Sequence, residues 1–524
     1  MHKQVRSLLL LDVSKQIEMN FSCKDKEQIE AHGLSLAQVE QQLERFQKGF
    51  APSDVVRAAR AGDGIERLSS QMIETYCQAF EQDKDKYVLA KFVPASGAAS
   101  RMFKDLYDYV DSDKSIEECP QVSELIDNID KFAFAAVLDD KLKTQGGSLS
   151  TYLAERKYKQ IVKTILQPDG LDYGQSPKAL ILFHDYGSQV RTALEEHLVE
   201  AANFCVNRDK HIHLHFTISP QHLDKVQSLL NEVLPRYEAT FGVKYDIQLS
   251  VQKSSTDTIA VNLDNTPARD HKGRLIFRPS GHGALIENLQ ETSGDIVWVK
   301  NIDNVEKDAL KTGDYKYKKA LCGFLLTIKQ KIDAILFDIE SKDYSESLKQ
   351  RIKDLCEKTL RVKLRCESEF ENNESYFDYV YSLLHRPVRV CSMVKNEGQP
   401  GGGPFWVGES NPRLQIVEKS QIDLSNEQYN KVFLSSTHFN PVDIVCSLTD
   451  HRGNKFELNA FVDENAGFIS EKTQQSAKIK IQERPGLWNG AMAEWLTFFV
   501  ETPIDYFNPV KTVNDLLKAA HRPL

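Results

Sequence analysis

Hydrophobic positions near the start of the chain recur at helical spacing. In the segment LSLAQVEQQLERFQKGF (34–50), apolar residues fall three or four positions apart, and Gln, Glu and Lys fill the positions between them. This spacing places the apolar side chains on one face of an amphipathic helix. We therefore expect residues 24–85 to be helical, and residues 1–85 to form a helical N-terminal region.

From about residue 88 the pattern changes to short apolar runs that alternate with amphipathic segments. Two segments have strong helical periodicity, 192–205 and 222–234. Alternation of strands and helices predicts a mostly parallel α/β sheet. The expected strands are 88–93, 179–184, 212–219, 245–252, 274–279 and 295–303.

Two charged, helix-like segments interrupt this alternation, at 105–175 and 306–385, and apolar strand-like runs return from residue 386. The expected organisation is an α/β core over 86–305, with 105–175 as a helical insertion. A second helical insertion follows at 306–385. A β-rich C-terminal part over 386–524 then completes the site.

Composition narrows the classes of protein that fit this pattern. The chain has 524 residues, of which 41% are hydrophobic and 27% charged, and its net charge of −9 argues against a nucleic-acid partner. No run approaches 18 apolar residues, so no membrane partner is expected. The nine cysteines form no CxxC pair, which favours reduced thiols and a cytoplasmic location. These features leave the oligomeric state open.

The first expected strand of the α/β core runs into a loop of small residues, PASGAAS (94–100), followed by Arg101. A loop with so few side chains allows a ligand to approach the backbone, and phosphate is the usual ligand of this kind. Ser96, Gly97 and Ser100 are therefore candidate binding residues, and Arg101 is a candidate partner for the phosphate charge. The alternative is a plain strand-to-helix turn, because no Walker sequence follows.

Three later segments carry further candidate residues. RPSGHGALIENL (278–289) places His282 between Gly281 and Gly283, and YFNPVKTVNDLL (506–517) contains Lys511. DIVWVKNIDNV (295–305) ends an apolar run with Asn301 and Asp303, where open α/β sheets bind ligands. Asp303 is either a turn residue or a hard oxygen ligand for Mg²⁺.

In this order, the segments resemble the signatures of sugar-nucleotide pyrophosphorylases, and of UDP-glucose pyrophosphorylases in particular. PASGAASRM is similar to L-A-A-G-x-G-T-R-M, RPSGHG to P-x-G-H-G, and FNPVKTVNDL to F-L-P-V-K-T-T-S-D-L. Lys178 matches the lysine of the family's Pro-Lys, and Gln252 fits its F-x-Q segment. Ala99 and Ala284 depart from the pattern, since the family has Gly and Asp there. At full length the chain also resembles a bacterial family of domains of unknown function.

The resemblance implies a fold and a reaction. The fold would be a Rossmann-like glycosyltransferase-A mixed sheet, as in nucleotide-diphospho-sugar transferases. The reaction would be Mg²⁺-dependent nucleotidyl transfer from a nucleoside triphosphate, with UTP favoured, to a sugar-1-phosphate, with release of pyrophosphate.

The resemblance also implies roles for the matched residues. Arg101 and Lys178 would neutralise the leaving phosphates, Lys511 would bind the sugar phosphate, and Asp303 would hold Mg²⁺. Lys104 and Lys395 are further candidates for phosphate contact. The expected nucleotide- and sugar-binding residues are Ser96, Gly97, Ser100, Gln252, Gly281, His282, Gly283 and Asn301.

Two other functions fit parts of the sequence. A glycosyltransferase would bind a finished nucleotide sugar and often carries a D-x-D pair, whereas this chain has the single Asp303. A non-catalytic relative of the same fold would explain Ala99 and Ala284. Separately, His211, His213 and His215 alternate along one expected strand, which favours a half-exposed strand face over a metal site.

Overall fold

The computed structural model describes residues 21–522, apart from 98, 399–400 and 475–476. Within the described residues the chain forms two compact units. The small unit takes its described residues from within Met1–Phe50, Lys253–Ser280 and Ile469–Glu483. The large unit takes its described residues from within Ala51–Gln252, Gly281–Phe468 and Arg484–Leu524.

The small unit contains helices α1 (Cys23–Ala31) and α2 (Leu36–Lys48), and the short antiparallel strands β9 (Thr258–Ile259) and β10 (Phe277–Arg278). The two-stranded sheet of β17 (Phe468–Gln474) and β18 (Ala477–Glu483) completes it. Capping boxes start both helices. The apolar face of α2 packs Val39, Leu43 and Phe46 against Ile259 and Val261. The strand predicted at 274–279 is thus wrong as a sheet strand, because only β10 forms and it pairs locally with β9.

The large unit is built around a mixed sheet whose order is β2-β3-β19-β12-β16-β11-β4-β7-β8, with β15 beside β12. Among these described strands, β16 runs antiparallel to both β12 and β11, and all other neighbours on the path are parallel. The mostly parallel α/β sheet predicted from the sequence is therefore confirmed. The strands are β2 (Arg60–Ala61), β3 (Gly64–Glu66), β4 (Leu89–Pro94), β7 (His211–Thr217), β8 (Lys244–Ser250), β11 (Ile296–Lys300), β12 (Val388–Lys395), β15 (His438–Phe439), β16 (Asp443–Ser447) and β19 (Leu496–Glu501).

The order of the strands creates a switch point between β4 and β11. From β4 the chain moves outward to β7 and β8, then returns to β11 on the other side of β4. Because the connections leave β4 and β11 in opposite directions, a crevice is expected outside the carboxyl ends of these two strands. The small-residue loop follows β4, and Asn301 and Asp303 follow β11.

Helices cover both faces of this sheet because successive side chains of a strand point to opposite faces. Leu89 and Val93 of β4 pack in one core, together with residues of α3 (Ser70–Asp83), α9 (Ala193–Phe204), α10 (Leu223–Phe241) and α12 (Asp308–Glu340). Ala90 and Phe92 pack in a second core with Ile286 of α11 (Ile286–Gln290). The helices predicted at 192–205 and 222–234 are α9 and α10.

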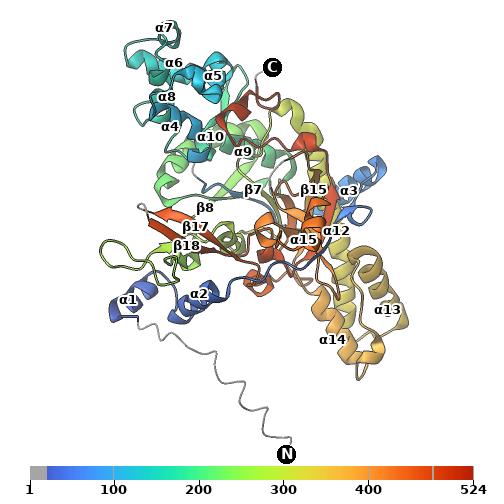
Figure 1. Cartoon of the computed structure of the whole chain (residues 1–524). Helices are drawn as coiled ribbons and strands as arrows, with labels where there is room; N and C mark the ends of the chain where they lie inside the picture. Colours follow the sequence, from blue (N-terminus) through green and yellow to red (C-terminus); the bar gives the residue numbers. More distant parts are fainter. Residues whose placement is uncertain (1–20, 98, 399–400, 475–476, 523–524) are drawn as a thin grey trace, which may run out of the picture. The chain divides into compact units, whose positions relative to one another are not determined.

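Helical segments extend the large unit (Figure 1). Residues 104–166 contain α4 (Lys104–Val110), α5 (Pro120–Asp127), α6 (Ala135–Thr144), α7 (Leu149–Ala154) and α8 (Tyr158–Leu166). After α12 come α13 (Glu346–Lys353), a π-helical turn and α14 (Asn373–Leu384). Among the described residues, no helix combines the length and apolarity that a membrane crossing needs.

Two further expectations were wrong. The run 179–184 gives β5 (Leu182–Asp185), which pairs with β6 (Val190–Thr192) in a separate hairpin. The turn between the two strands has Gly187 at a φ of 75°, a conformation that glycine adopts without strain. This tight turn lets β5 pair with the next strand in the sequence, and not with a strand of the central sheet. The helical prediction for 24–85 was too broad, since β1 (Val55–Ala58), β2 and β3 interrupt it. β1 pairs with β13 (Gly403–Val407), which also pairs with β14 (Arg413–Val417).

Candidate functional site

The small-residue loop is attached to the sheet at its start and open beyond it. The backbone N–H of Ala95 donates to the carbonyl oxygen of Thr217 (3.1 Å), and the Ser219 hydroxyl donates to the carbonyl oxygen of Ser96 (2.7 Å). Gly97 is exposed, and a Cβ added to it would meet no atom within 4 Å. The backbone at Gly97 therefore borders open space.

The loop ends in exposed Ser100 and Arg101. Among the described residues the Arg101 guanidinium has no ion-pair partner, so its charge is available to an anion. A loop of this form, with free backbone and a free cation at the carboxyl end of a central strand, is suited to a phosphate group.

Two lysines converge on Asp303 at the same edge of the sheet. Lys178 Nζ lies 2.8 Å and Lys511 Nζ 2.9 Å from Asp303 Oδ2. Burial alone would raise the pKa of Asp303, but the charges of Lys511 and Lys178 outweigh it and hold the pKa below its usual value. The carboxylate is therefore ionised and contacts two cations, which stand 125 and 208 positions from it in the sequence and together outweigh its single negative charge.

Backbone hydrogen bonds bring the C-terminal segment to this place. Val510 N–H donates to the carbonyl oxygen of Asp303 (3.0 Å), and Val513 N–H donates to that of Met102 (3.1 Å). The Lys178 ammonium also donates to the carbonyl oxygen of Val510 (2.8 Å). The segment that carries Lys511 thus contacts both the loop after β11 and the residue directly after Arg101.

The donor set fits a Mg²⁺ ion that arrives with a polyphosphate. Asp303 Oδ1 is buried and has no hydrogen-bond partner among the described residues, so its lone pairs are not used within the protein. Oδ2 already accepts from both lysines. Mg²⁺ at nucleotide sites takes one or two carboxylates and completes its shell with waters and substrate phosphates. A single carboxylate oxygen is enough for an ion that takes its other ligands from water and substrate phosphates. One oxygen is not enough to hold Mg²⁺ by protein ligands alone.

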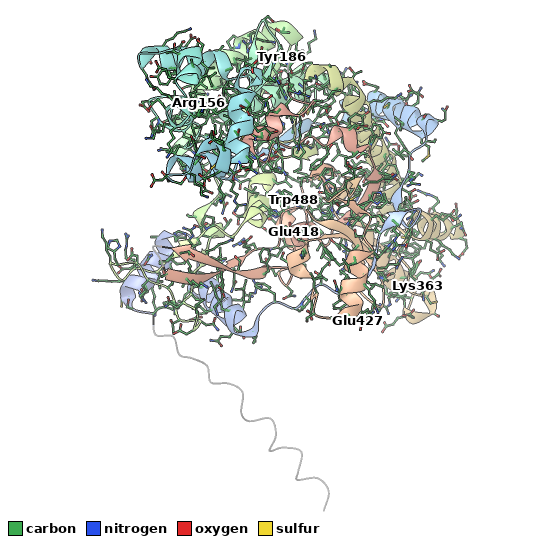
Figure 2. The ribbon with its side chains drawn as sticks, turned by 45° about the horizontal axis from the view of Figure 1, so that its top comes forward. Arg156, Tyr186, Lys363, Glu418, Glu427 and Trp488 are labelled. Carbon is green, nitrogen blue, oxygen red and sulfur yellow. The ribbon has the colours of Figure 1, made fainter. Side chains whose placement is uncertain are left out.

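His282 belongs to a group of contacts with the segment 485–489. Its Nδ1 accepts from the N–H of Leu487 (3.0 Å), so the ring proton is on Nε2, which lies 3.4 Å from Glu418 Oε1. The ring stacks on Trp488 with centroids 4.1 Å apart. Figure 2 labels Trp488 and Glu418, which lie next to each other in that view. Although burial raises the pKa of Glu418, its contact with His282 brings the pKa below the usual value.

The glycines beside His282 have a structural explanation. A Cβ on Gly283 would come within 2.1 Å of the carbonyl oxygen of Pro485, and Gly281 has a φ of 80°. The expectation that these glycines open the backbone to a base or sugar is therefore corrected for Gly283, since this chain's own backbone occupies the space.

The other predicted residues lie at or near the same carboxyl edge. Gln252 follows β8, and Asn301 follows β11, where its carbonyl oxygen accepts from the N–H of Asn304 (3.2 Å).

Of the three alternating histidines, His215 forms hydrogen bonds with Thr292 (2.8 Å) and Ser250 (2.6 Å). His211 pairs with Asp246 instead (2.8 Å). His213 also lies near Asp246, at 3.4 Å, so two of the three rings share a neighbour while His215 has other partners, and the three do not converge on one point.

A buried charge network below the switch point was missed by the sequence analysis. Lys91 of β4 and Lys300 of β11 both contact Glu200 of α9, at 2.6 and 2.8 Å. Burial lowers the pKa of Lys91 to about 8, although Glu200 opposes this shift. The signal was a lysine within or at the end of an apolar run, in VLAKFV and VWVK. The shared carboxylate ties together the two strands that frame the candidate site.

The sequence analysis also did not identify Trp488 and Glu418 as neighbours of His282. Neither lies in a segment whose pattern pointed to a ligand, and both are assigned to the His282 group only by contact.

These features define a mixed α/β protein whose candidate site lies at a switch point and combines a small-residue loop with an Arg and a Lys–Asp–Lys cluster. The chain belongs to the family described as Domain of unknown function (DUF4301), whose model matches residues 22–522. No curated protein matches it in sequence.

Among solved structures, the chain is similar to a mutant UDP-glucose pyrophosphorylase from Leishmania major in complex with UDP-glucose. The identity is 12% and the TM-score 0.42, over 94% of this chain and 77% of that one. It is also similar to a uridine diphosphate N-acetylglucosamine pyrophosphorylase from Trypanosoma brucei in complex with an inhibitor. Here the identity is 12% and the TM-score 0.44, over 91% of this chain and 74% of that one.

Proposed function

We propose that this protein transfers a nucleotidyl group from a nucleoside triphosphate, with UTP favoured, to a sugar-1-phosphate and releases pyrophosphate. One observation carries the proposal. Lys178 and Lys511 converge on Asp303 at the carboxyl edge of the switch point, beside the loop that ends in Arg101. Three cations at the carboxyl edge of the sheet suit two polyanionic substrates that repel each other.

The proposed reaction needs no covalent protein intermediate. A sugar phosphate oxygen attacks the α-phosphorus and forms a new P–O bond, while the bond to the β-phosphate oxygen breaks and pyrophosphate leaves with the electron pair. The attacking phosphate is already ionised near neutral pH, so no general base is required. Catalysis then depends on alignment of the two substrates and on neutralisation of their charge.

The lysines have a direct role in this scheme. In the structure both lysines contact Asp303, whose single negative charge offsets only one of their two positive charges. On substrate binding, Lys178 would turn to the leaving phosphates with Arg101, and Lys511 to the sugar phosphate. Mg²⁺, when bound, supplies further positive charge to the phosphates, with Asp303 as its protein ligand. The open backbone at Gly97, with Ser96 and Ser100 on either side of it, would contact the phosphate chain.

The remaining proposed contacts select base and sugar. Gln252 and Asn301 stand at the same edge of the sheet, and His282 with Gly281 is assigned to base or sugar.

All nine cysteines lie in the described part of the chain and are free thiols, which suits the cytoplasmic location that we propose.

The test is pyrophosphate release from the full chain over a grid of UTP, GTP, CTP and ATP against several sugar-1-phosphates, with Mg²⁺. We expect turnover with at least one pair, and its loss when Mg²⁺ is chelated. Thermal unfolding with each nucleotide identifies a non-catalytic relative, because a ligand stabilises the folded state by mass action. Nucleotide stabilisation without pyrophosphate release would overturn the proposed reaction, and stabilisation by none of the four would overturn the nucleotide site itself.

A further inference from the structure

A second cluster of polar side chains lies at the opposite edge of the sheet. Because β16 is antiparallel, its last residue, Ser447, lies opposite Ile296 and Val388, the first residues of β11 and β12. Asp450 and His451 follow β16, and His385 lies three positions before the first residue of β12. The five residues of β11 span roughly 17 Å at about 3.3 Å per residue. The cluster is therefore separate from the Lys–Asp–Lys site.

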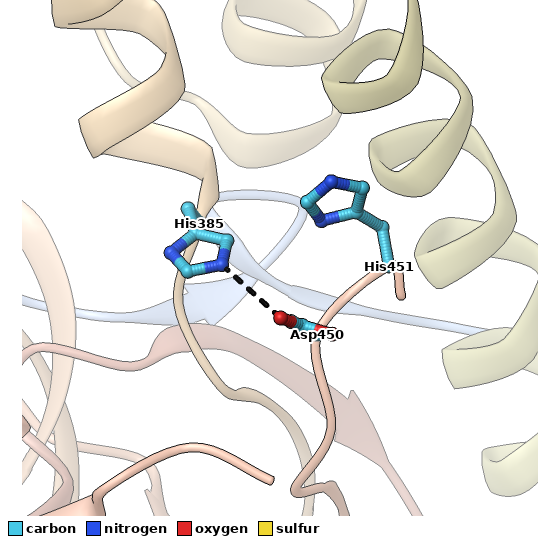
Figure 3. Close-up of side chains that lie close together, drawn as sticks. All are labelled: His385, Asp450 and His451. Carbon is cyan, nitrogen blue, oxygen red and sulfur yellow. Dashed lines mark ion pairs between the residues drawn. The ribbon is translucent and has the colours of Figure 1, made fainter. Parts of the chain in front are cut away.

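Figure 3 shows His385, Asp450 and His451 close together at this edge. One ligand atom from each lies within 4.8 Å of the others, and His385 Nε2 is 3.7 Å from Asp450 Oδ2. In a tetrahedral zinc site with bonds of about 2.1 Å, ligand atoms stand roughly 3.4 Å apart. Small side-chain movements would therefore bring the three atoms to bonding distance of one ion.

His451 has a free nitrogen for this purpose. Its side chain is fully buried, and its Nδ1 has no hydrogen-bond partner among the described residues. Its Nε2 lies 2.9 Å from Glu340 Oε1 of α12, at an angle that falls short of a hydrogen bond. A small ring rotation would complete that bond and keep the proton on Nε2, which leaves the Nδ1 lone pair for a metal. A carboxylate behind a ligating histidine is the usual second partner of such sites.

The other two ligands are held in place. Asp450 Oδ1 accepts the backbone N–H groups of Arg452 and Asn454, both at 2.8 Å, so the orientation of Oδ2 is fixed. The His385 ring stacks on Tyr381 and meets the edge of Phe456, with centroids 5.0 and 5.1 Å apart.

The nearby cations are already paired. Arg452 contacts Glu340 at 2.8 Å, and Lys329 contacts Asp333 at 3.0 Å while it donates to two backbone carbonyls. Their charges are thus balanced by carboxylates other than Asp450, which lowers their repulsion of a bound cation.

We propose that His385, Asp450 and His451 bind one divalent transition-metal ion of the zinc type. Two imidazoles and a carboxylate are a ligand set that zinc accepts. The side chains of His385 and Asp450 are 30% and 11% exposed, so a water molecule can reach a fourth position. The ion joins the end of α14 to the loop after β16, and through Glu340 it also braces α12. The site does not depend on the proposed nucleotidyl transfer.

The experiment uses the untagged full-length protein, stripped with a chelator and titrated with Zn²⁺ against a chromophoric competitor. We expect one tight site per chain, a rise in Tm on addition of Zn²⁺, and visible absorption of the Co²⁺-substituted protein typical of low coordination number. His385→Phe keeps the aromatic contacts and removes the ligand nitrogen. Asp450→Asn keeps an oxygen for the two backbone N–H groups.

Each of these variants should bind Zn²⁺ at least about 10-fold more weakly than the wild type, since loss of even an outer partner typically costs 10- to 100-fold. The matched control is His211→Ala, which removes a half-exposed histidine paired with Asp246 and should leave Zn²⁺ affinity unchanged. The Tm of each metal-free variant shows whether that variant is folded. If His385→Phe or Asp450→Asn is misfolded, the Zn²⁺ affinity of the other variant decides whether the site exists. A wild type without a tight site, or equal Zn²⁺ affinity in wild type and the folded variants, overturns the proposal.

Discussion

Replacement of Lys511 by methionine separates charge from shape at the candidate site. Methionine keeps most of the apolar stem and deletes the ammonium that lies 2.9 Å from Asp303. The Lys511 side chain is 57% exposed, whereas Lys178 is 14% exposed and keeps its own contact with the same carboxylate. The substitution therefore removes a cation from the site without leaving Asp303 unpaired.

The expected effects on stability and on activity differ in size. A half-exposed ion pair contributes about 0–1 kcal/mol, so the Tm of Lys511→Met should stay within about 2 °C of the wild type. A charge-assisted contact to a phosphate is worth about 1.5–3 kcal/mol, so kcat/KM should fall by roughly 10- to 150-fold. A large loss of activity at nearly constant stability is the signature of a phosphate contact.

The assay is pyrophosphate release with the best substrate pair, over a range of sugar-1-phosphate concentrations. The matched control is Lys86→Met, since Lys86 is 62% exposed and paired with Asp83 on a different part of the surface. We expect the control to keep wild-type kcat/KM. Equal activity of Lys511→Met and the wild type would refute the reasoning, because Lys511 would then serve only to neutralise Asp303.

Three further predictions follow from the same structure. Asp303→Asn should abolish Mg²⁺-dependent turnover while calorimetry still detects metal-free nucleotide binding; normal turnover with normal Mg²⁺ dependence would contradict it. Gly97→Val should lose nucleotide binding at native Tm, because its Cβ meets open space in the protein; an unchanged nucleotide Kd would mean that the loop is only a turn. Burial, and then the charge of Asp314, raises the pKa of Glu306 from 4.5 to about 7. Between pH 4.5 and 7 the Glu306 carboxyl therefore stays protonated in the folded protein but ionises in the unfolded chain. The free energy of unfolding of the wild type should fall by roughly 3 kcal/mol over this range. Urea unfolding at pH 5 and pH 8 should show Glu306→Gln without that loss; an identical pH dependence in both proteins would be the contrary result.

Local patterns in the sequence were enough for much of the α/β core. The apolar run before Pro94 became β4, the two amphipathic segments became α9 and α10, and the small residues after Pro94 became a loop open at Gly97. These features depend on side-chain periodicity and on the absence of bulk, which neighbouring residues determine by themselves. The same patterns placed Asp303 directly after a central strand.

The partners of these segments were decided only by the tertiary structure. The apolar runs of β5 and β16 look alike in sequence, yet β5 closes a local hairpin and β16 enters the central sheet in the reverse direction. An apolar run indicates that a segment is buried. It does not indicate the direction in which the strand runs or which strand lies next to it.

The two polar clusters illustrate the same limit. Lys178, Asp303 and Lys511 were each singled out in the sequence, but their shared carboxylate was not, and His385, Asp450 and His451 had no local signal at all. Each cluster joins residues far apart in the chain, at an edge of the sheet that the order and direction of all its strands create. Contacts of this range arise from the packing of the whole unit, whereas a local pattern reports only which face of one segment is buried.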